Sequence, residues 1–152
     1  MTIRYTHTNI IARDWRKLAQ FYQIVFHCLP LAPERDLSGD WLSEGTGVYN
    51  AALQGIHLRL PGYGNSGPTL EIFSYDEMLD KLPPAANRQG IAHLAFSVDN
   101  VQACLQKVIE HGGQVIGKVV TRQIYNVGLL TFAYATDPES NILEIQHWDS
   151  DE

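Results

Sequence analysis

The chain has 152 residues, of which 45% are hydrophobic and 18% charged, and its formal net charge is −6 at pH 7. This length and composition are those of an ordinary globular chain of one domain or two small modules, not of a disordered or fibrous protein. The acidic balance argues against a nucleic-acid backbone as partner, because such binding relies on clustered Lys and Arg.

Membrane association is not expected either. No apolar run approaches the roughly 18 residues of a membrane helix, and the N-terminal stretch MTIRYTHTN lacks the apolar core of a signal peptide. The two cysteines, Cys28 and Cys104, lack CxxC spacing and are most simply free thiols. We therefore expect a cytoplasmic protein with no membrane partner.

The first half of the chain predicts the order β-α-β-β-β. A strand around His7 breaks at Asp14, which suits a helix N-cap, and an amphipathic helix follows that ends before Pro30. Three strands are then expected, in GVYNAALQ, IHLRLPG and TLEIFSY. The segment PERDLSGDWLSEGTG reads as an extra loop, in which Trp41 is a candidate substrate cover or interface anchor.

The second half repeats this plan when His93 is aligned with His7. The strand GIAHLAFSV leads to an N-cap at Asn100 and to a helix that closes on Gly112 and Gly113. Strands are expected next in QVIGKVV, LLTFAYATD and NILEIQHW, and the Pro-rich DKLPPAANRQG reads as the linker between the halves. We expect a single domain over residues 1–152, made of module 1 (about residues 3–79) and module 2 (about residues 89–149).

Side-chain alternation separates ionisable from aliphatic residues in the predicted strands. Glu71 lies opposite Leu70 and Ile72, and Glu144 lies opposite Leu143 and Ile145. His93 likewise lies opposite a row of apolar residues, whereas the strand around His7 is less regular. Because the aliphatic face should pack on the helix of each half, the histidines and glutamates are expected together on one concave surface.

These four residues occupy repeat-related positions and predict a metal site. Semi-buried carboxylates that point at imidazoles are costly unless positive charge compensates them. A divalent cation supplies that charge, and the mixture of nitrogen and carboxylate oxygen suits Ni, Co, Zn, Mn or Fe. We expect one such ion per site.

The chain resembles the vicinal oxygen chelate superfamily over residues 5–148, in the strings HTNIIARDWRKLAQFY, TLEIF, GIAHLAFSVDNV and DPESNILEIQHW. That superfamily includes glyoxalase I, methylmalonyl-CoA epimerase, fosfomycin-resistance proteins and extradiol dioxygenases. The resemblance implies an α+β fold in which two tandem βαβββ modules form a curved mixed sheet around a metal-binding cleft. It also implies that the metal ligands are His7, Glu71, His93 and Glu144.

The same resemblance implies a lyase or isomerase of the glyoxalase I or epimerase type. The metal would act as a Lewis acid on the vicinal oxygens of a small substrate while a carboxylate moves a proton next to a carbonyl. Glu144 takes the role of base and Glu71 that of its counterpart. Many glyoxalases have an asparagine where this chain has Tyr75, which argues against a glutathione-derived substrate.

Two other classes remain open. A non-haem iron dioxygenase of the extradiol type would use His7, His93 and Glu144 as ligands and would need an acid/base group, for which the candidates are His57, His147 and Tyr125. A drug-binding resistance module would need no catalysis, and such relatives typically lack the ligands. Metal content together with oxygen consumption would separate the three classes.

Three further expectations concern the oligomeric state, two histidines near helix ends and one tryptophan. Two small modules leave free sheet edges, which predicts a homodimer. His27 and His111 should lie at helix ends, where a cation favours the negative end of the helix dipole. Trp15 should be part of the core.

Overall fold

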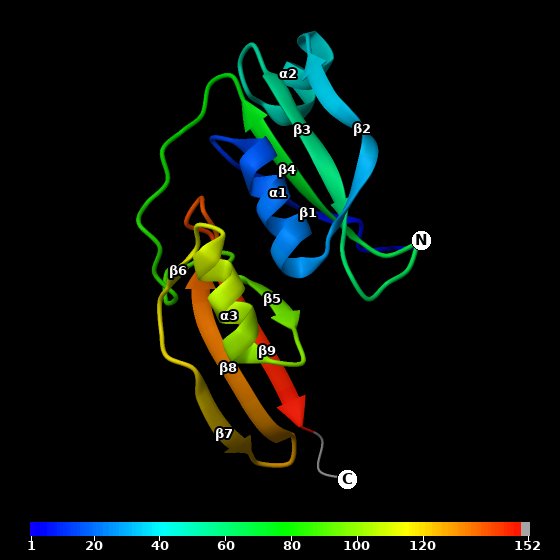
Figure 1. The fold of residues 1–152 in the computed structure, drawn as a ribbon. Coiled ribbons are helices and arrows are strands. Elements are labelled where there is room, and N and C mark those ends of the chain that lie inside the picture. The colour runs from blue at the N-terminus through cyan, green and yellow to red at the C-terminus, as the bar shows by residue number, and fades with distance from the viewer. Residues whose placement is uncertain (150–152) are drawn as a thin grey trace. The chain divides into compact units, whose positions relative to one another are not determined.

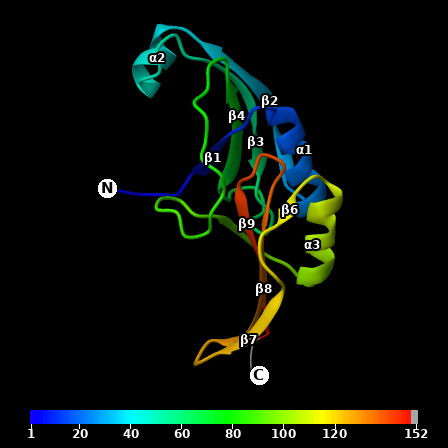
Figure 2. The ribbon, with the colours of Figure 1, turned by 90° about the vertical axis from the view of Figure 1, so that its left-hand side faces the viewer.

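The computed structural model describes residues 1–149 and folds as two compact units, unit 1 from Met1 to Lys81 and unit 2 from Leu82 onward (Figure 1). Each unit has one mixed β-sheet with a helix against one of its faces (Figure 2). This arrangement is the α+β class that the sequence predicts. No helix in the described part of the chain is long and apolar enough to cross a membrane.

Unit 1 contains a four-stranded sheet. Its elements in chain order are β1 (His7–Ile11), α1 (Trp15–Phe26), β2 (Leu29–Ser38), α2 (Asp40–Thr46), β3 (Ala52–Arg59) and β4 (Thr69–Tyr75). The strand order is β1-β4-β3-β2. β1 is parallel to β4, and the other pairs are antiparallel. The first and last strands of the unit are therefore neighbours.

Unit 2 contains a five-stranded sheet. Its elements are β5 (Leu94–Ser97), α3 (Val101–Glu110), β6 (Gln114–Val115), β7 (Val120–Ile124), β8 (Gly128–Thr136) and β9 (Ile142–Asp149). The strand order is β5-β9-β8-β6, and β7 also pairs with β8. β5 is parallel to β9. Again the first strand of the unit lies beside the last.

The predicted repeat extends to the register of these parallel pairs. Asn9 lies opposite Glu71 in unit 1, and Ala95 lies opposite Glu144 in unit 2. Asn9 and Ala95 each follow their histidine by two residues, so His7 and His93 hold equivalent positions. One detail differs from expectation, because β5 begins at Leu94, one residue after the histidine.

Helices α1 and α3 begin directly after Asp14 and Asn100, the two residues that the sequence predicts as N-caps. The Asp14 side chain accepts a hydrogen bond from the Lys17 amide at 3.0 Å, and the Asn100 side chain accepts one from the Ala103 amide at 2.9 Å. His27 and His111 occupy the C-cap positions of α1 and α3. Trp15 is buried, as expected.

The aliphatic side of each sheet is the helix-covered side. The side chains of Leu70 and Ile72 in β4 and of Leu143 and Ile145 in β9 are fully buried. α1 contacts β3 and β4, and α3 contacts β8 and β9. Because side chains alternate across a strand, the glutamate in each last strand faces away from the helix.

The strand assignment between α1 and β4 was wrong. GVYNAALQ and IHLRLPG do not form two strands but contribute to the single strand β3, and the expected loop PERDLSGDWLSEGTG contains the end of β2 and helix α2. β2 is an edge strand that pairs only with β3, so it tolerates Pro30 and Pro33. The prolines and the polar residues that follow remove the period-two pattern by which a strand is recognised.

The segment QVIGKVV, predicted as one strand, contains the two-residue strand β6 and only the first residue of β7. The amides of Ile116 and Gly117 both donate to the carbonyl of Tyr134, at 3.0 and 3.2 Å. This shared acceptor interrupts the ladder after β6, and β7 resumes the pairing further along β8.

Both cysteines are buried free thiols, as predicted. Burial raises the pKa of the Cys28 thiol to about 12 and also raises the pKa of Cys104. A thiol that stays protonated is a poor nucleophile and a poor metal ligand. The cysteines therefore contribute to packing rather than to chemistry.

Candidate functional site

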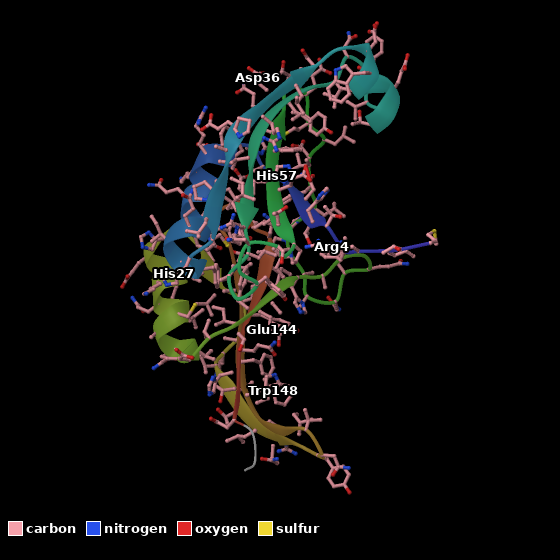
Figure 3. All side chains as sticks on the ribbon, turned by 90° about the vertical axis from the view of Figure 1, so that its right-hand side faces the viewer. Arg4, His27, Asp36, His57, Glu144 and Trp148 are labelled. Atoms are coloured by element: carbon pink, nitrogen blue, oxygen red, sulfur yellow. The ribbon has the colours of Figure 1, made fainter. Side chains whose placement is uncertain are left out.

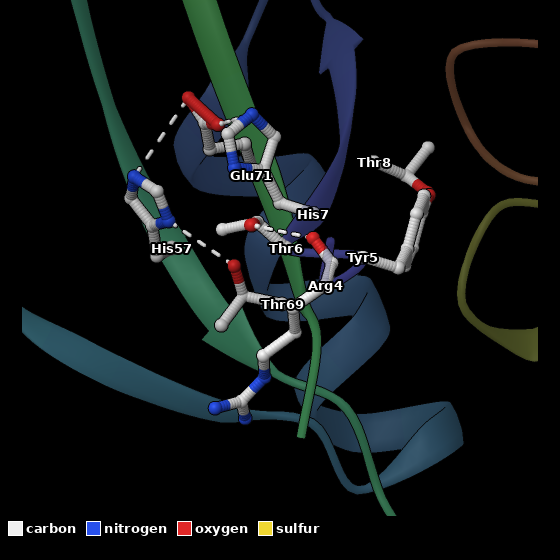
Figure 4. Close-up of polar contacts among 8 residues, drawn as sticks. All are labelled: Arg4, Tyr5, Thr6, His7, Thr8, His57, Thr69 and Glu71. Atoms are coloured by element: carbon white, nitrogen blue, oxygen red, sulfur yellow. Dashed lines mark hydrogen bonds and ion pairs between the residues drawn. The ribbon is translucent and has the colours of Figure 1, made fainter. Parts of the chain in front are cut away.

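The first His–Glu pair lies on the sheet face of unit 1 that points away from α1. Glu71 stands in the middle of β4, between β1 and β3. The Nε2 atom of His7 lies 2.6 Å from the Oε2 atom of Glu71 (Figure 4). The His7 side chain is 42% exposed, whereas that of Glu71 is 9% exposed. The carboxylate is thus more enclosed than the imidazole beside it.

His57 joins this pair from β3. It lies directly opposite Glu71 in the antiparallel ladder, with its Nε2 atom 3.7 Å from Glu71 Oε1 and its Nδ1 atom 3.2 Å from the Thr69 hydroxyl (Figure 4). Burial lowers the pKa of His57; the charge of Glu71 opposes this shift, and Arg35 and His7 add to it. The neutral imidazole is therefore held by Thr69, with Nε2 turned towards Glu71.

One carboxylate oxygen of Glu71 lacks a hydrogen bond. Oε2 is buried and has no donor among the described residues, since its close approach to His7 does not have hydrogen-bond geometry. An unsatisfied buried carboxylate oxygen is unfavourable. The missing donor and the adjacent His7 imidazole would therefore fit a cation held by both residues.

The second His–Glu pair lies in unit 2. The Nε2 atom of His93 is 3.0 Å from the Oε2 atom of Glu144, and the two side chains are 25% and 16% exposed. Glu144 lies on the same strand as Trp148 (Figure 3). The indole of Trp148 donates a 3.0 Å hydrogen bond to the Gln146 side chain. Alternation places Glu144, Gln146 and Trp148 on the sheet face away from α3.

Tyr134 is the third member of this cluster. It lies opposite Glu144, the position that His57 holds opposite Glu71. Its ring centroid is 5.0 Å from that of His93. Burial and, secondly, the charge of Glu144 raise the pKa of the Tyr134 phenol. The phenol is therefore protonated at neutral pH and can donate a hydrogen bond.

The structure thus brings His7 together with Glu71 and His93 together with Glu144. Among the residues it describes, no group of three or more His, Cys, Asp or Glu is gathered closely enough to hold a metal ion. The binding of one ion by both pairs stays a prediction.

Two of the acid/base candidates lie elsewhere. His147 projects from the opposite side of β9 to Glu144, where its Nδ1 lies 2.8 Å from the Val98 carbonyl and its Nε2 lies 3.1 Å from the Asp149 carboxylate. Tyr125 lies in the exposed turn between β7 and β8. Of the three candidates, only His57 lies beside a His–Glu pair.

Sequence reasoning left the orientation of His57 open and missed Tyr134. Both residues are identified by one rule, that they lie opposite the glutamate in an antiparallel pair. Applying the rule requires the hairpin register, which no short motif in the sequence reveals. The β3–β4 connection contains PGYGNSGP, whose length did not indicate the register.

Comparison with known proteins agrees with this architecture. The sequence pattern of the Glyoxalase/Bleomycin resistance protein/Dioxygenase superfamily matches residues 4–145. The chain is similar in fold to a glyoxalase family protein from Bacillus cereus, with 14% identity, a TM-score of 0.75, and coverage of 97% of this chain and 94% of that one. No curated protein sequence matches the chain.

Two further solved structures are similar in fold and are described as enzymes. One is a glyoxalase/bleomycin resistance protein/dioxygenase family enzyme from Burkholderia phytofirmans, with 17% identity, a TM-score of 0.55, and coverage of 95% of this chain and 98% of that one. The other is a glyoxalase-related enzyme from Fulvimarina pelagi, with 16% identity, a TM-score of 0.55, and coverage of 95% and 87%. At such identities the likeness concerns the fold alone.

Proposed function

The chain belongs to the Glyoxalase/Bleomycin resistance protein/Dioxygenase superfamily, and we propose that it is a divalent-metal-dependent lyase or isomerase of the glyoxalase type. Its substrate is a small molecule with vicinal oxygens, from which a proton is removed next to a carbonyl. The observation that carries the proposal is the buried Oε2 atom of Glu71, which has no hydrogen-bond donor in the described chain and lies beside His7 Nε2.

The proposed ligands are the two His–Glu pairs, namely His7, Glu71, His93 and Glu144. This mixture of imidazole nitrogen and carboxylate oxygen suits Ni, Co, Zn, Mn or Fe. When bound, a divalent ion supplies Lewis-acid stabilisation of a developing oxyanion. Glu71 supports the assignment most strongly, because an enclosed carboxylate needs a compensating cation.

Proton transfer is assigned to Glu144. Its side chain is more exposed than that of Glu71, so it has more freedom to approach a substrate. The protonated phenol of Tyr134 lies opposite it in the sheet and can donate a hydrogen bond to a substrate oxygen. Glu144 accepts the proton next to the carbonyl and returns it to the product.

An extradiol-type dioxygenase is the second candidate, and His57 is the observation that favours it. Such chemistry needs an acid/base group beside the metal ligands, and the ring centroid of the neutral His57 lies 5.9 Å from that of His7. Three ligands, namely His7, His93 and Glu144, would then hold ferrous iron, and Glu71 would have no catalytic part.

Turnover with and without oxygen distinguishes the candidates. Metal-loaded protein is screened against small 2-oxo and 2-hydroxy carbonyl compounds in deuterated buffer under anaerobic conditions. The proposal predicts turnover without oxygen, with deuterium exchange at the carbon next to the carbonyl or retention of the proton by transfer within the site. Activity that requires dioxygen and appears only with ferrous iron would assign the protein to the dioxygenases. Tight ligand binding without any turnover would favour the resistance-module class.

We also propose that the protein is a homodimer. In each unit the first strand is a short sheet edge, with five residues in β1 and four in β5. Free edges invite pairing with a second chain, and a two-fold dimer is the commonest solution. Light scattering at micromolar concentration should give twice the chain mass of 17.1 kDa. A mass near that of one chain would reject the dimer.

A cytoplasmic location is proposed from the cysteines. Cys28 and Cys104 are buried free thiols, a state typical of reducing compartments. Cell fractionation should place the protein with cytoplasmic markers.

A further inference from the structure

The face of unit 1 that carries Glu71 also carries Arg59. This arginine lies directly opposite Thr69 in the β3–β4 ladder, and Thr69 precedes Glu71 by two residues. Residues that are directly opposite, or two apart on one strand, project from the same side of a sheet. The Arg59 side chain therefore leaves the sheet on the side of Glu71, away from α1.

Arg35 reaches the same face from β2. It lies opposite Gly55, which precedes His57 by two residues on β3. The influence of the Arg35 charge on His57, whose pKa it helps to lower, agrees with this placement. Arg35, His57 and Arg59 thus form a row along the outer half of the sheet, next to the His7–Glu71 pair.

Neither arginine has a carboxylate partner among the described residues. Arg59 donates to the side-chain oxygen of Asn65 at 2.9 Å, and Arg35 donates to the carbonyl of Pro33. Both side chains are half-buried. Each guanidinium has five N–H donors in a planar fork that matches an oxyanion, so most donors of both groups remain available.

Two other arginines of unit 1, Arg13 and Arg16, have carboxylate partners. Arg13 pairs with Asp80 at 2.7 Å, and Arg16 makes two hydrogen bonds with Glu34 at 2.8 and 2.9 Å. Glu34 directly precedes Arg35 on β2, and its side chain meets α1 on the helix side of the sheet. Asp36, which directly follows Arg35, lies opposite Gln54 and therefore projects from the other face as well. Both carboxylates adjacent to Arg35 in sequence are thus turned away from it.

The row ends at an apolar cluster that lowers the local polarity. α2 covers this end of the sheet, where Leu42, Leu53 and Phe73 are buried together. Phe73 lies opposite Gly55, which is the partner of Arg35. Attraction between a guanidinium and an anion is stronger beside apolar groups than in open water. Arg35 is therefore the arginine of the row that should bind an anion most strongly.

We propose that Arg35 and Arg59 bind an oxyanion group of the substrate, a carboxylate or a phosphate, over His57. Successive same-face positions on β3 are about 7 Å apart, so the long side chains on either side of His57 can reach one group between them. This inference deepens the proposed function, because it makes the substrate an acid whose charged end lies beside the oxygens that bind the metal. The anion site itself is contained in unit 1.

The test measures binding of inorganic phosphate, acetate and uncharged acetamide to the full chain by calorimetry, with the metal removed by chelation. Wild-type protein should bind phosphate and acetate and not acetamide. Arg35→Gln and Arg59→Gln should each weaken anion binding about tenfold. Tighter binding of phosphate than of acetate would indicate a phosphorylated substrate, and the reverse order a carboxylic acid.

Two controls separate charge from folding. Arg35→Lys keeps the cation but not the planar fork, so it should lose less affinity than Arg35→Gln. Arg13→Gln removes an arginine that already has an acid partner and should change nothing. Equal losses in Arg35→Lys and Arg35→Gln, equal losses in Arg13→Gln and Arg35→Gln, or no anion binding by folded wild-type protein would overturn the inference.

Omitting the metal separates this inference from the proposed function. Suppose that the metal-free protein binds anions through Arg35 and Arg59, but that the protein does not take up a divalent ion when one is added and does not turn over a substrate. The anion site then stands and the proposed function fails. If the protein takes up metal and turns over a substrate, but Arg35→Gln and Arg59→Gln leave its anion affinity unchanged, the proposed function stands and the inference fails.

Discussion

The two units present the same His–Glu pair in the same register and differ in the residue opposite the glutamate. In unit 1 this residue is His57, and the enclosed Glu71 has an oxygen without a donor. In unit 2 it is Tyr134, and Glu144 is more exposed. The repeat thus conserves the position of a carboxylate while its surroundings change.

This difference suggests a division of labour between the units. The enclosed carboxylate of unit 1 lies beside a neutral imidazole and suits the binding of a cation, and the same sheet face carries the two arginines of the proposed anion site. The more exposed carboxylate of unit 2, next to a protonated phenol, suits proton transfer.

The largest effect is expected from replacing the two glutamates. Glu144→Gln preserves shape and removes the base, so kcat should fall about 10²–10⁴-fold with little change in substrate binding. Both variants remove a proposed metal ligand, and Glu71→Gln should lower metal affinity more than Glu144→Gln, because Glu71 is the more enclosed carboxylate. Steady-state kinetics and metal titration check both, with Glu110→Gln on the surface of α3 as control. Equal effects of Glu71→Gln and Glu144→Gln on both measurements would remove the division of labour.

A glycine in unit 1 has no counterpart in unit 2. Gly55 lies opposite Phe73, whereas Phe132 holds the equivalent position opposite Gln146. A Cβ atom on Gly55 would collide with the Ile72 carbonyl oxygen and the Phe73 ring. Gly55→Ala should therefore lower the free energy of unfolding by about 3 kcal/mol.

Urea denaturation measures this effect, and Gly45→Ala is the matched control. A Cβ atom on Gly45 meets nothing within 4 Å, so that variant should be as stable as wild type or slightly more stable. If Gly55→Ala is equally harmless, the close approach of Phe73 to β3 is refuted.

The helix caps should behave alike in the two units. Asp14→Ala and Asn100→Ala each remove one side-chain acceptor at a helix N-terminus, so each should cost about 1 kcal/mol of unfolding free energy. Asp14→Asn keeps the acceptor and serves as control. Thermal unfolding followed by circular dichroism measures the changes. A much larger loss at one cap would show that the two helices are not equivalent in stability.

The smallest expected effect is a pH dependence of the unfolding free energy that arises from His147 in unit 2. Hydrogen bonds to the Val98 carbonyl and the Asp149 carboxylate raise the pKa of His147 from its ordinary value of 6.5. A raised folded-state pKa stabilises the fold below pH 6.5, and this stabilisation is lost as the pH rises through the raised value. The stability difference between wild type and His147→Gln should therefore shrink from pH 5.5 to pH 8.5. A constant difference would reject this role of His147.

The features that the sequence predicts correctly are those that depend on local residue patterns. Asp14 and Asn100 marked both helix starts, and alternation around Glu71 and Glu144 separated the helix-covered face from the polar face. Edge strand β2 was missed, because its prolines and charged residues mimic a loop and its stability comes from pairing with β3.

Residues brought to the candidate site by long-range pairing were harder to predict. His57 and Tyr134 become neighbours of the His–Glu pairs only through the register of two antiparallel ladders. Arg35 depends on the missed strand, and the irregular register between Leu31 and Arg35 shifts its position further. Sequence periodicity carries no information on such pairings.

Metal content tests the central claim most directly, that a His–Glu pair from each unit binds a divalent ion. Elemental analysis of folded wild-type protein should give about one divalent ion per site. His7→Ala and His93→Ala should both lose most of the metal while their circular dichroism stays unchanged, and His111→Ala, at the end of α3, should retain it. Full occupancy in folded His93→Ala protein would contradict the account.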